Sequence, residues 1–191
     1  MGVDAKAILN NENELRERVA YIINIYQQPA LVEKFLPGRE FTVGILGRPD
    51  AKLYSRNPDW YEKDGFHRFP ILELDTSGST ETWIYTNEAK SKEVPEEGSL
   101  GYFCPAEVEP DLEKKLRQLA LRAHQFIYAL DISRTDIRLD EEGNPRLIEI
   151  NTLPGLTPDY SDLCLQAKAE GIKYEDLILD ILYQIGRASC R

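Results

Sequence analysis

The sequence predicts an α+β fold in which mixed or antiparallel strands pack against helices. Residues 133–151 read as a β-hairpin because apolar and polar residues alternate on both sides of a turn. Residues 111–130 repeat apolar residues at helical spacing and predict one long amphipathic helix. Hairpins outnumber helix crossovers along the chain, which favours antiparallel pairing. With 191 residues, 42% of them hydrophobic, the chain can form one sizeable core or the two lobes of a split domain.

The helices that the sequence predicts cover residues 11–26, 111–130, 162–169 and 174–183. Asn11 followed by Glu14 is typical of a capping box at the start of the first helix, and Pro29 ends it. Gly171 is a suitable residue to end the third helix. Apolar residues at helical spacing are expected to face inward: Leu15, Val19, Ile22, Ile23, Tyr26, Leu112, Leu116, Leu119, Ala123, Phe126, Ile127, Leu177, Ile178, Ile181 and Leu182.

Strands outside the hairpin are expected over residues 30–35, 40–46, 52–54, 71–74 and 82–85. The first two are joined across Pro37-Gly38, and Phe41, Val43 and Ile45 share one face of the second strand. The polar residues 87–101 predict a loop.

The hairpin brings acidic residues opposite each other. Across it the sequence pairs Asp140 with Pro145, Asp136 with Glu149 and Arg134 with Asn151, and matches Ile137 and Leu139 to Ile148 and Ile150. Facing carboxylates repel, so the pattern favours a hard divalent cation between Asp136 and Glu149, with the Asn151 carbonyl oxygen as a further ligand. The alternative is a solvated hairpin face whose acids point into water. The Pro154-Gly155 turn that follows would bring backbone N–H groups beside such a cation.

Charge and composition exclude several classes of protein. The formal net charge of −10 argues against nonspecific binding to nucleic acid or to anionic lipid, although it does not exclude a nucleotide substrate. Cys104, Cys164 and Cys190 form no C-x-x-C pair, and their odd number fits a reducing cytoplasm. The sequence has no apolar run long enough to cross a membrane, and its polar start does not resemble a signal peptide.

Several blocks of the sequence resemble the D-alanine–D-alanine ligases, members of the ATP-grasp superfamily, and occur in the same order. The blocks are residues 30–47, Asn87-Glu88-Ala89-Lys90, residues 102–106, and the stretch from Arg134-x-Asp136 to Glu149-Ile150-Asn151-Thr152-x-Pro154-Gly155-Leu156-Thr157. The likeness runs from about residue 2 to about residue 185. It implies an ATP-grasp-like fold, present as a partial domain over residues 1–185. Residues 186–191 break the helical pattern and are interpreted as a cloning tail.

The resemblance also implies roles for individual residues. Implied catalytic residues are Arg134 and Gly155; implied nucleotide contacts are Glu33, Lys34, Leu36, Glu40 and Lys90; the implied acceptor contact is Ser161; and the implied ligands of Mg²⁺ or Mn²⁺ are Asp136, Glu149 and Asn151.

In that resemblance, Glu33 accepts from the adenine amino group, Lys34 and Leu36 frame the ring, and Glu40 holds the ribose hydroxyls. Lys90 approaches the phosphates, Arg134 faces the acyl phosphate, and the Gly155 backbone serves the tetrahedral centre. Taken by themselves, the same residues also fit an edge strand with one ion pair, a solvated lysine and an exposed arginine.

The chain departs from the family pattern at two loops. Ser91 replaces the aromatic residue that often follows the loop lysine. The acceptor loop at residues 158–162 matches Ser161 only with one extra residue, and Asp159 and Asp162 add negative charge where a carboxylate should dock. The acceptor therefore need not be D-alanine. Outside these loops, His67, His124 and the run Tyr102–Pro105 are interpreted as structural.

The main functional hypothesis is the carboxy-terminal part of an ATP- and Mg²⁺-dependent carboxylate–amine ligase that forms a peptide bond through an acyl phosphate. The resemblance implies a role in peptidoglycan synthesis, with ATP and a small amino-acid-like substrate as partners. The family's donor domain and glycine-rich loop would precede Met1, so the chain alone is expected to be inactive without the missing region or a complementing chain. A homodimer is left open. The alternatives are a noncatalytic nucleotide- or metal-binding module, and an ATP-grasp ligase with a different amine acceptor.

Overall fold

The computed structural model describes residues 5–75 and 101–186. It divides into two units, one of residues 1–37 with 76–101 and the other of residues 38–75 with 102–191. We describe each unit by itself. The predicted strand at 82–85 and most of the predicted loop at 87–101 lie outside the described residues.

The first unit contains the 3₁₀-helix η1 (Ala5–Ala7) and helix α1 (Glu12–Tyr26). Asn11 caps α1 through its side chain, which accepts from the Glu14 amide at 3.0 Å. The Glu14 carboxylate reaches back to the amide of Asn10 at 2.8 Å, so the predicted capping box is confirmed with its return bond moved by one residue. Of the residues predicted to face inward, Leu15, Val19 and Ile22 are half-buried, whereas Ile23 and Tyr26 are exposed, so the predicted inward face is only partly right.

Residues 30–35 do not form the predicted strand. They run as an extended segment in which Leu31 is 82% exposed and Val32 is 55% exposed. Alternating apolar residues become a strand only when a neighbouring strand accepts their backbone hydrogen bonds, and none of the described strands pairs with this segment.

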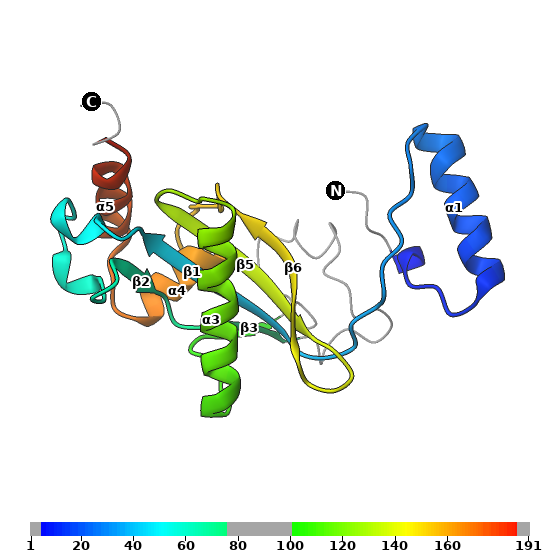
Figure 1. The fold of residues 1–191 in the computed structure, drawn as a ribbon, viewed down its shortest axis with the longest axis horizontal. Helices are drawn as coiled ribbons and strands as arrows, with labels where there is room; N and C mark the ends of the chain where they lie inside the picture. Colours follow the sequence, from blue (N-terminus) through cyan, green and yellow to red (C-terminus); the bar gives the residue numbers. More distant parts are fainter. Residues whose placement is uncertain (1–4, 76–100, 187–191) are drawn as a thin grey trace. The chain divides into compact units, whose positions relative to one another are not determined.

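A six-stranded sheet forms the centre of the second unit (Figure 1). Its strands are β1 (Glu40–Gly47), β2 (Phe66–Arg68), β3 (Leu72–Asp75), β4 (Gly101–Phe103), β5 (Ile132–Leu139) and β6 (Pro145–Asn151). They run in the order β4-β3-β1-β5-β6, with β2 also paired to β1. Strand β1 is antiparallel to β2, β3 and β5, and β5 is antiparallel to β6, which confirms the predicted α+β class.

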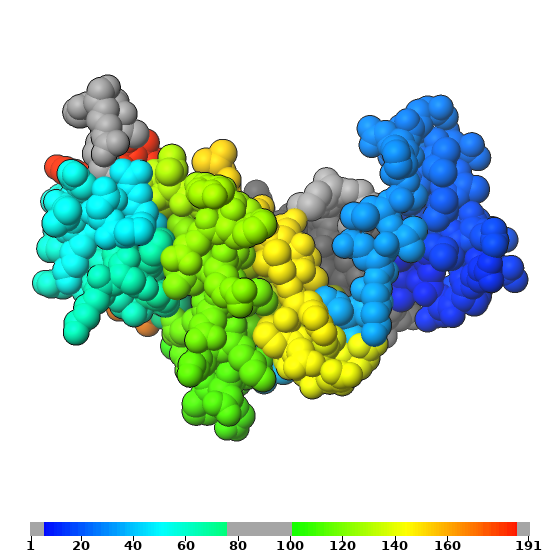
Figure 2. Space-filling model, in the orientation of Figure 1, coloured from blue at the N-terminus to red at the C-terminus, as the bar shows by residue number. Residues whose placement is uncertain are grey.

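Helices cover both faces of the sheet. Helix α3 (Pro110–Phe126) packs on the face that carries Phe41, Val43, Ile45 and Ile137, all fully buried. Helices α4 (Asp162–Ala169) and α5 (Tyr174–Gly186) form the other core cluster. Figure 2 shows α3 beside the β5–β6 hairpin on one surface of this unit.

Several predicted details of these helices are wrong. Helix α3 ends at Phe126, whose side chain is 84% exposed, and the residue after it, Ile127, is 39% exposed. In α5, Leu177 and Ile181 are buried as predicted, but Leu182 is 55% exposed, and the polar residues Asp180 and Gln184 complete the buried face. Helix α5 also extends to Gly186, one residue into the predicted tail.

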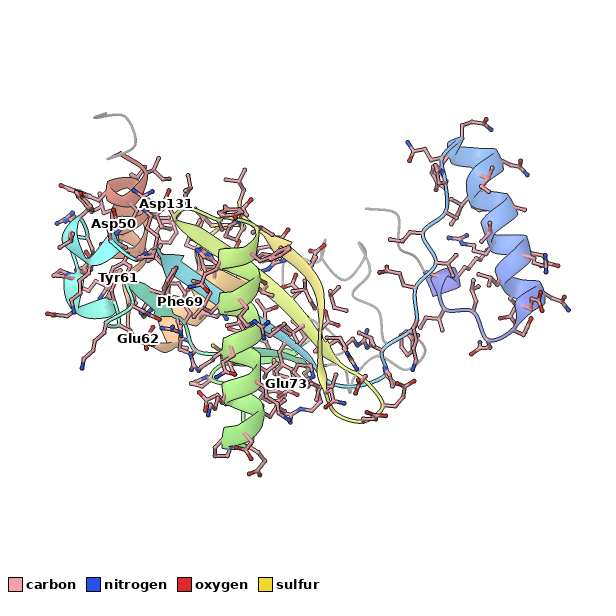
Figure 3. The ribbon with its side chains drawn as sticks, in the orientation of Figure 1. Asp50, Tyr61, Glu62, Phe69, Glu73 and Asp131 are labelled. Atoms are coloured by element: carbon pink, nitrogen blue, oxygen red, sulfur yellow. The ribbon has the colours of Figure 1, made fainter. Side chains whose placement is uncertain are left out.

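The segment between β1 and β2 is held in place by hydrogen bonds instead of by strand pairing. The strand predicted at 52–54 is wrong, since Ala51–Leu53 is the 3₁₀-helix η2 and a second such helix, η3, covers Pro58–Trp60. The fully buried carboxylate of Asp180 accepts from Ser55 Oγ at 2.6 Å and also from the Tyr61 hydroxyl. Burial and this bond to Asp180 raise the pKa of Tyr61, which is labelled in Figure 3.

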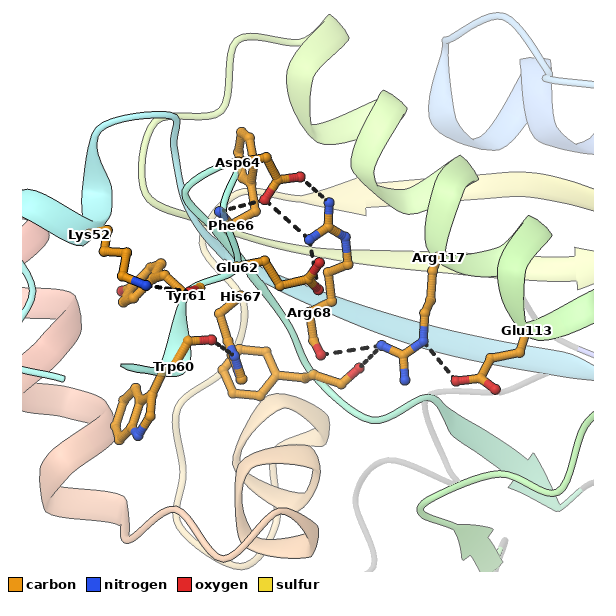
Figure 4. A network of polar contacts seen from close by, with 11 residues as sticks. Lys52, Trp60, Tyr61, Glu62, Asp64, Phe66, His67, Arg68, Glu113 and Arg117 are labelled. Atoms are coloured by element: carbon orange, nitrogen blue, oxygen red, sulfur yellow. Dashed lines mark hydrogen bonds and ion pairs between the residues drawn. The ribbon is translucent and has the colours of Figure 1, made fainter. Parts of the chain in front are cut away.

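A second polar network joins this segment to α3 (Figure 4). Arg117 of α3 donates to the carbonyl oxygens of Arg68 and Phe69 at 3.2 and 3.1 Å, and pairs with Glu113. His67 contacts the Trp60 carbonyl oxygen at 2.8 Å and Glu170 at 2.9 Å. These contacts support the structural interpretation of His67.

His124 is also structural, as predicted. It is buried, its Nδ1 lies 2.7 Å from Ser133 Oγ, and its Nε2 lies 3.2 Å from the Gly47 carbonyl oxygen. Burial lowers the pKa of His124. The packing role predicted for Tyr102–Pro105 is wrong for its aromatic residues, because Tyr102 is 49% exposed and Phe103 is 54% exposed.

Candidate functional site

The β5–β6 hairpin has the predicted register at the end that carries Asp136 and Glu149, and a different register near its turn. Asp136 lies opposite Glu149 and Arg134 opposite Asn151, as predicted. Near the turn, Leu139 takes the place opposite Pro145 that was predicted for Asp140, and Ile137 faces Leu147 instead of Ile148. The pairing changes at a β-bulge between Asp136 and Ile137, where Ile148 is the additional residue of β6.

The turn explains this shift. The Asp140 carboxylate accepts from the amides of Glu142 and Asn144 at 3.0 and 2.8 Å, and the Asp140 amide donates to the Asn144 carbonyl oxygen. Asp140 is therefore part of the turn and not of the paired strand, which shortens the ladder by one residue. Ile148, 50% exposed, lies in the bulge that restores the register of the acids.

One face of the sheet carries a polar strip. Because side chains alternate along a strand, Glu40 and Thr42 of β1 lie on the face opposite Phe41 and Val43. On β5 the same alternation separates Arg134, Asp136 and Arg138 from the core residues. The pairing of β1 with β5 places Thr42 beside Asp136 and Glu40 beside Arg138.

Arg134 lies at the centre of a group that we call the Arg134 cluster: Arg134, Asp136, Glu149, Asn151 and Asp162. Its guanidinium contacts Asp136 through two bonds, Nε to Oδ1 at 3.0 Å and Nη2 to Oδ2 at 2.8 Å. Nη1 lies 3.0 Å from Asp162 Oδ2, and Nη2 lies 3.8 Å from Glu149 Oε1. Three carboxylates therefore surround one guanidinium.

Further bonds fix the acids of the Arg134 cluster. Thr42 Oγ1 donates to Asp136 at 2.9 Å, which ties the hairpin to β1. Asn151 Nδ2 donates to Glu149 Oε1 at 3.0 Å and lies 3.5 Å from Asp136 Oδ2. Sequence reasoning did not identify Thr42. The available signal was its place in β1, where it alternates with buried Phe41 and Val43.

Burial and charge act in opposite directions on the Arg134 cluster. Burial raises the pKa of Asp136, and its bonds to Arg134 and Thr42 offset only part of this rise. Burial by itself lowers the pKa of Arg134, but the carboxylates of Asp136, Asp162 and Glu149 raise it overall. The side chain of Asp136 is 13% exposed and that of Glu149 is 38% exposed, so the cluster opens toward solvent on the Glu149 side.

The residues that the sequence predicts as metal ligands are brought together, and their donor set fits a hard cation. Mg²⁺ is usually held by one or two carboxylates together with water and substrate phosphates. Asp136 and Glu149 supply the carboxylates, whereas Asn151 directs its Nδ2 at them, so its oxygen would face a cation only after the amide turns over. Within residues 5–75 and 101–186, no group of three or more His, Cys, Asp or Glu side chains is arranged as a metal site.

Gly155 and Ser161 lie next to each other after β6. A Cβ atom on Gly155 would lie 2.7 Å from Ser161 Oγ, so a larger residue there would displace the serine. Ser161 Oγ accepts from the amide of Thr157 at 3.0 Å. Asp159, in the same loop, pairs with Lys168 at 2.5 Å, with both side chains exposed.

The predicted nucleotide contacts are only partly placed. Glu40 lies on the polar strip, 3.6 Å from Arg138, with both side chains largely buried. Glu33, Lys34 and Leu36 belong to the other unit, where Glu33 and Lys34 are exposed. Lys90 lies outside the described residues.

A pocket of about 390 Å³ opens between α4, α5 and the loop before α4. Asp159, Cys164, Lys168 and Tyr174 are among the residues that line it, and no member of the Arg134 cluster does. In the part of the chain that the structure describes, no helix is both long and apolar enough to span a bilayer.

Comparisons with known proteins identify the family of the chain. The family described as D-ala D-ala ligase C-terminus matches residues 5–183. A D-alanine–D-alanine ligase of Nitrosococcus oceani is 34% identical over 158 residues, and an uncharacterized protein, y4sG, of Sinorhizobium fredii is 30% identical over 175 residues. These matches cover 83% and 92% of this chain but 42% and 46% of the relatives, so the chain spans less than half of their length.

A solved structure shares the fold. The D-alanine–D-alanine ligase of Bacillus anthracis, crystallised in complex with ATP, superposes with a TM-score of 0.66 at 20% identity. The match covers 94% of this chain and 48% of that chain. The predicted ATP-grasp-like fold is thereby confirmed.

Proposed function

The chain belongs to the D-ala D-ala ligase C-terminus family, and we propose that it supplies the metal and acyl-phosphate half of an ATP- and Mg²⁺-dependent carboxylate–amine ligase. The observation that supports this function is the register of the β5–β6 hairpin, which sets Asp136 opposite Glu149 beside Arg134. Two facing carboxylates and a guanidinium, on a polar strip that opens to solvent at Glu149, are suited to hold a cation and an oxyanion together.

In the proposed reaction, an oxygen of the donor carboxylate attacks the γ-phosphorus of ATP and ADP leaves. The acceptor amine then attacks the acyl carbon, phosphate leaves with the electrons of the broken C–O bond, and the amine loses a proton. When bound, Mg²⁺ would offset the charge of the phosphate oxygens. Asp136, Glu149 and the Asn151 oxygen would hold it.

Other residues of the chain receive roles in the same proposal. Arg134 would donate from its guanidinium to the acyl phosphate, where a planar fork of N–H groups matches phosphate oxygens. The Gly155 backbone would stabilise the tetrahedral centre, and Ser161 beside it would contact the acceptor. For the nucleotide, Glu40 would hold the ribose, Glu33, Lys34 and Leu36 the adenine, and Lys90 the phosphates.

The wider context is proposed from the family. It includes a role in peptidoglycan synthesis, a cytoplasmic location, and completion of the active site by further protein, either more of the same chain or another chain. Because the named relatives are more than twice as long as the matched region, we expect no turnover from the 191 residues alone.

The first prediction tests the metal site directly. Mg²⁺ or Mn²⁺ should raise the melting temperature of the chain, because a cation that binds only the folded state stabilises it. Glu149→Gln should abolish most of this rise, since it removes the negative charge of one ligand. Differential scanning fluorimetry over a range of metal concentrations measures both proteins.

The matched control is Glu142→Gln, which removes an exposed acid from the turn of the same hairpin. Its response to metal should equal that of the wild type. Equal responses of the wild type and of Glu149→Gln would contradict the hairpin as the metal site.

A specific observation favours a second candidate function, that of a ligase whose acceptor amine is not D-alanine. The guanidinium that the family pattern assigns to anionic groups already contacts Asp162 in this chain.

A further inference from the structure

Helix α4 crosses β1 at Gly44, on the face of the sheet that carries the polar strip. Gly44 follows Thr42 by two residues, so both lie on that face, and the β1–β5 register sets Gly44 opposite Arg134. A Cβ atom on Gly44 would lie 2.5 Å from Leu163 Cδ1 and 2.9 Å from Gln166 Oε1. The missing side chain therefore lets α4 pack directly on β1, at the border of the Arg134 cluster.

Gln166 of α4 bridges a gap in the sheet. Along β1, the ladder with β3 ends at Thr42 and the ladder with β2 begins at Ile45. Pro70, in the connection between β2 and β3, has no N–H to donate across this gap. Gln166 is fully buried, and its Nε2 donates to the carbonyl oxygens of Thr42 and Pro70 at 2.8 and 2.9 Å. Because both partners are acceptors, they determine which end of the amide faces the gap.

The bonds of Gln166 reach the Arg134 cluster through Thr42. The carbonyl oxygen of Thr42 accepts from Gln166, and its hydroxyl donates to Asp136 Oδ1 at 2.9 Å. Thr42 is buried, so it is held on one side by α4 and on the other by the acid of the hairpin. Residues that hydrogen-bond to a metal ligand orient that ligand and tune its affinity for the metal.

We propose that Gln166 is a positioning residue for the proposed metal site. It holds the Thr42 backbone to α4, which directs the Thr42 hydroxyl at Asp136 and orients the carboxylate that would bind Mg²⁺. This inference rests on the proposed function for its role in a ligase. The orientation of Asp136 is measurable without metal, nucleotide or turnover, because Arg134 Nε donates to Asp136 Oδ1 at 3.0 Å.

A second buried glutamine provides a matched control. Gln184 of α5 is also fully buried, and its Nε2 donates to the Ala51 carbonyl oxygen and to the Tyr61 hydroxyl, both at 3.2 Å. In Gln184, as in Gln166, Oε1 has no hydrogen-bond partner among the described residues. The two glutamines thus match in burial and bonding, but the partners of Gln184 belong to the segment that Asp180 holds.

The first measurement is Mn²⁺ binding to the 191-residue chain, by isothermal titration calorimetry well below the melting temperature of each variant. Gln166→Met keeps a side chain of similar length and removes both donors. It should weaken Mn²⁺ binding about fivefold, less than the roughly tenfold typical of a direct partner of a metal ligand. Gln184→Met should also destabilise the fold but should leave Mn²⁺ affinity within about twofold of the wild type.

A double variant tests the route through Thr42. Thr42→Val removes the hydroxyl that contacts Asp136 and should weaken Mn²⁺ binding about tenfold. Adding Gln166→Met to Thr42→Val should cause no further loss, because the effect of Gln166 is transmitted by the hydroxyl that is already absent.

The second measurement needs no metal. The Arg134 Nε–H resonance of the ¹⁵N-labelled chain, assigned by its loss in Arg134→Lys, reports on the bond to Asp136. It should move in Gln166→Met and in Thr42→Val, and should stay in place in Gln184→Met. Gln166→Asn, whose amide is one methylene shorter, is the second variant should Gln166→Met fail to fold, and the resonance should move in it as well.

An Arg134 resonance that stays in place in both Gln166 variants would overturn the inference. Equal losses of Mn²⁺ affinity in Gln166→Met and Gln184→Met, or additive losses in the double variant, would also overturn it. Failure of the proposed function has a different signature. The wild type and Glu149→Gln would then respond equally to metal, while the Arg134 resonance would still move in Gln166→Met and not in Gln184→Met.

Discussion

Asp180 and Asp136 are both carboxylates removed from solvent, yet their surroundings differ in kind. Asp180 is fully buried and accepts from neutral donors, namely the Ser55 and Tyr61 hydroxyls and the backbone amides of Arg56 and Asn57. Asp136 is partly exposed, accepts from a guanidinium and a hydroxyl, and shares that guanidinium with two further acids.

The difference separates a structural carboxylate from one that we propose to be functional. The donors of Asp180 are fixed by the fold of residues 51–61, so the carboxylate holds that segment to α5 and has no coordination left to offer. The Arg134 cluster has more acids than cations and opens to solvent at Glu149. An unbalanced charge at a site that is open to solvent favours the binding of a ligand. A buried carboxylate whose hydrogen bonds are all made contributes instead to the stability of the fold.

The largest expected effect therefore comes from the structural carboxylate. Asp180→Ala should lower the free energy of unfolding by about 3 kcal/mol, because it leaves several buried donors without an acceptor. Urea denaturation followed by circular dichroism measures the change. Asp59→Ala, an exposed acid in η3, is the control and should change stability by less than about 0.5 kcal/mol.

Asp136→Asn should cost less than Asp180→Ala in the same measurement, because it relieves repulsion among the acids while removing one partner of Arg134. If Asp136→Asn were the more destabilising change, the division between structural and functional carboxylates would be wrong.

A smaller effect is expected at the other end of the polar strip. The chain should bind AMP with a Kd of about 1 mM, and Glu40→Ala should weaken binding about fivefold by removing the carboxylate proposed to hold the ribose. Isothermal titration calorimetry tests this. Glu73→Ala is the matched control, because Glu73 also pairs with an arginine, Arg39, but lies opposite Phe41 on the other face of β1.

Micromolar binding of AMP by the wild-type chain would mean that the nucleotide site is more complete than proposed. Equal weakening by Glu73→Ala would assign the effect to lost ion pairs at the sheet end and not to a ribose contact.

Local patterns explain which elements were predictable from the sequence. The cap at Asn11 depends on residues within one turn, and the alternation of Phe41, Val43 and Ile45 depends on one strand. The pairing of Asp136 with Glu149 was predicted as well, although through a turn that is one residue too short and without the compensating bulge at Ile148. The hydrogen bonds that Asp140 makes within the turn set its length, and the alternation of apolar and polar residues does not reveal those bonds.

The remaining features depend on contacts between distant parts of the chain. Ser55 and Asp180 are 125 residues apart in the sequence, and nothing near either residue indicates the other. Residues 30–35 alternate like a strand but find no partner among the described strands. Asp162 was recognised as an additional charge, but its contact with Arg134 requires α4 to be placed against the hairpin.

The smallest effect that the comparison predicts is a dependence on pH. Burial raises the pKa of Asp136 above its ordinary value of 3.8, so the folded protein binds this proton more tightly than the unfolded chain does. The contribution of Asp136 to stability should therefore fall as pH rises from about 3.8 through the raised pKa of the folded state, and should stay constant above it. Asp136→Asn removes this titration and serves as the reference.

Urea unfolding of both proteins between about pH 3.5 and 7 gives the difference in unfolding free energy, which should decline for the wild type relative to the variant as pH increases. A saturating concentration of Mg²⁺ should reverse the decline, because a cation favours the ionised carboxylate and binds only the folded site. A difference that is flat with pH, or that grows with pH in the absence of metal, would show that Arg134 compensates Asp136 as fully as its neutral donors compensate Asp180.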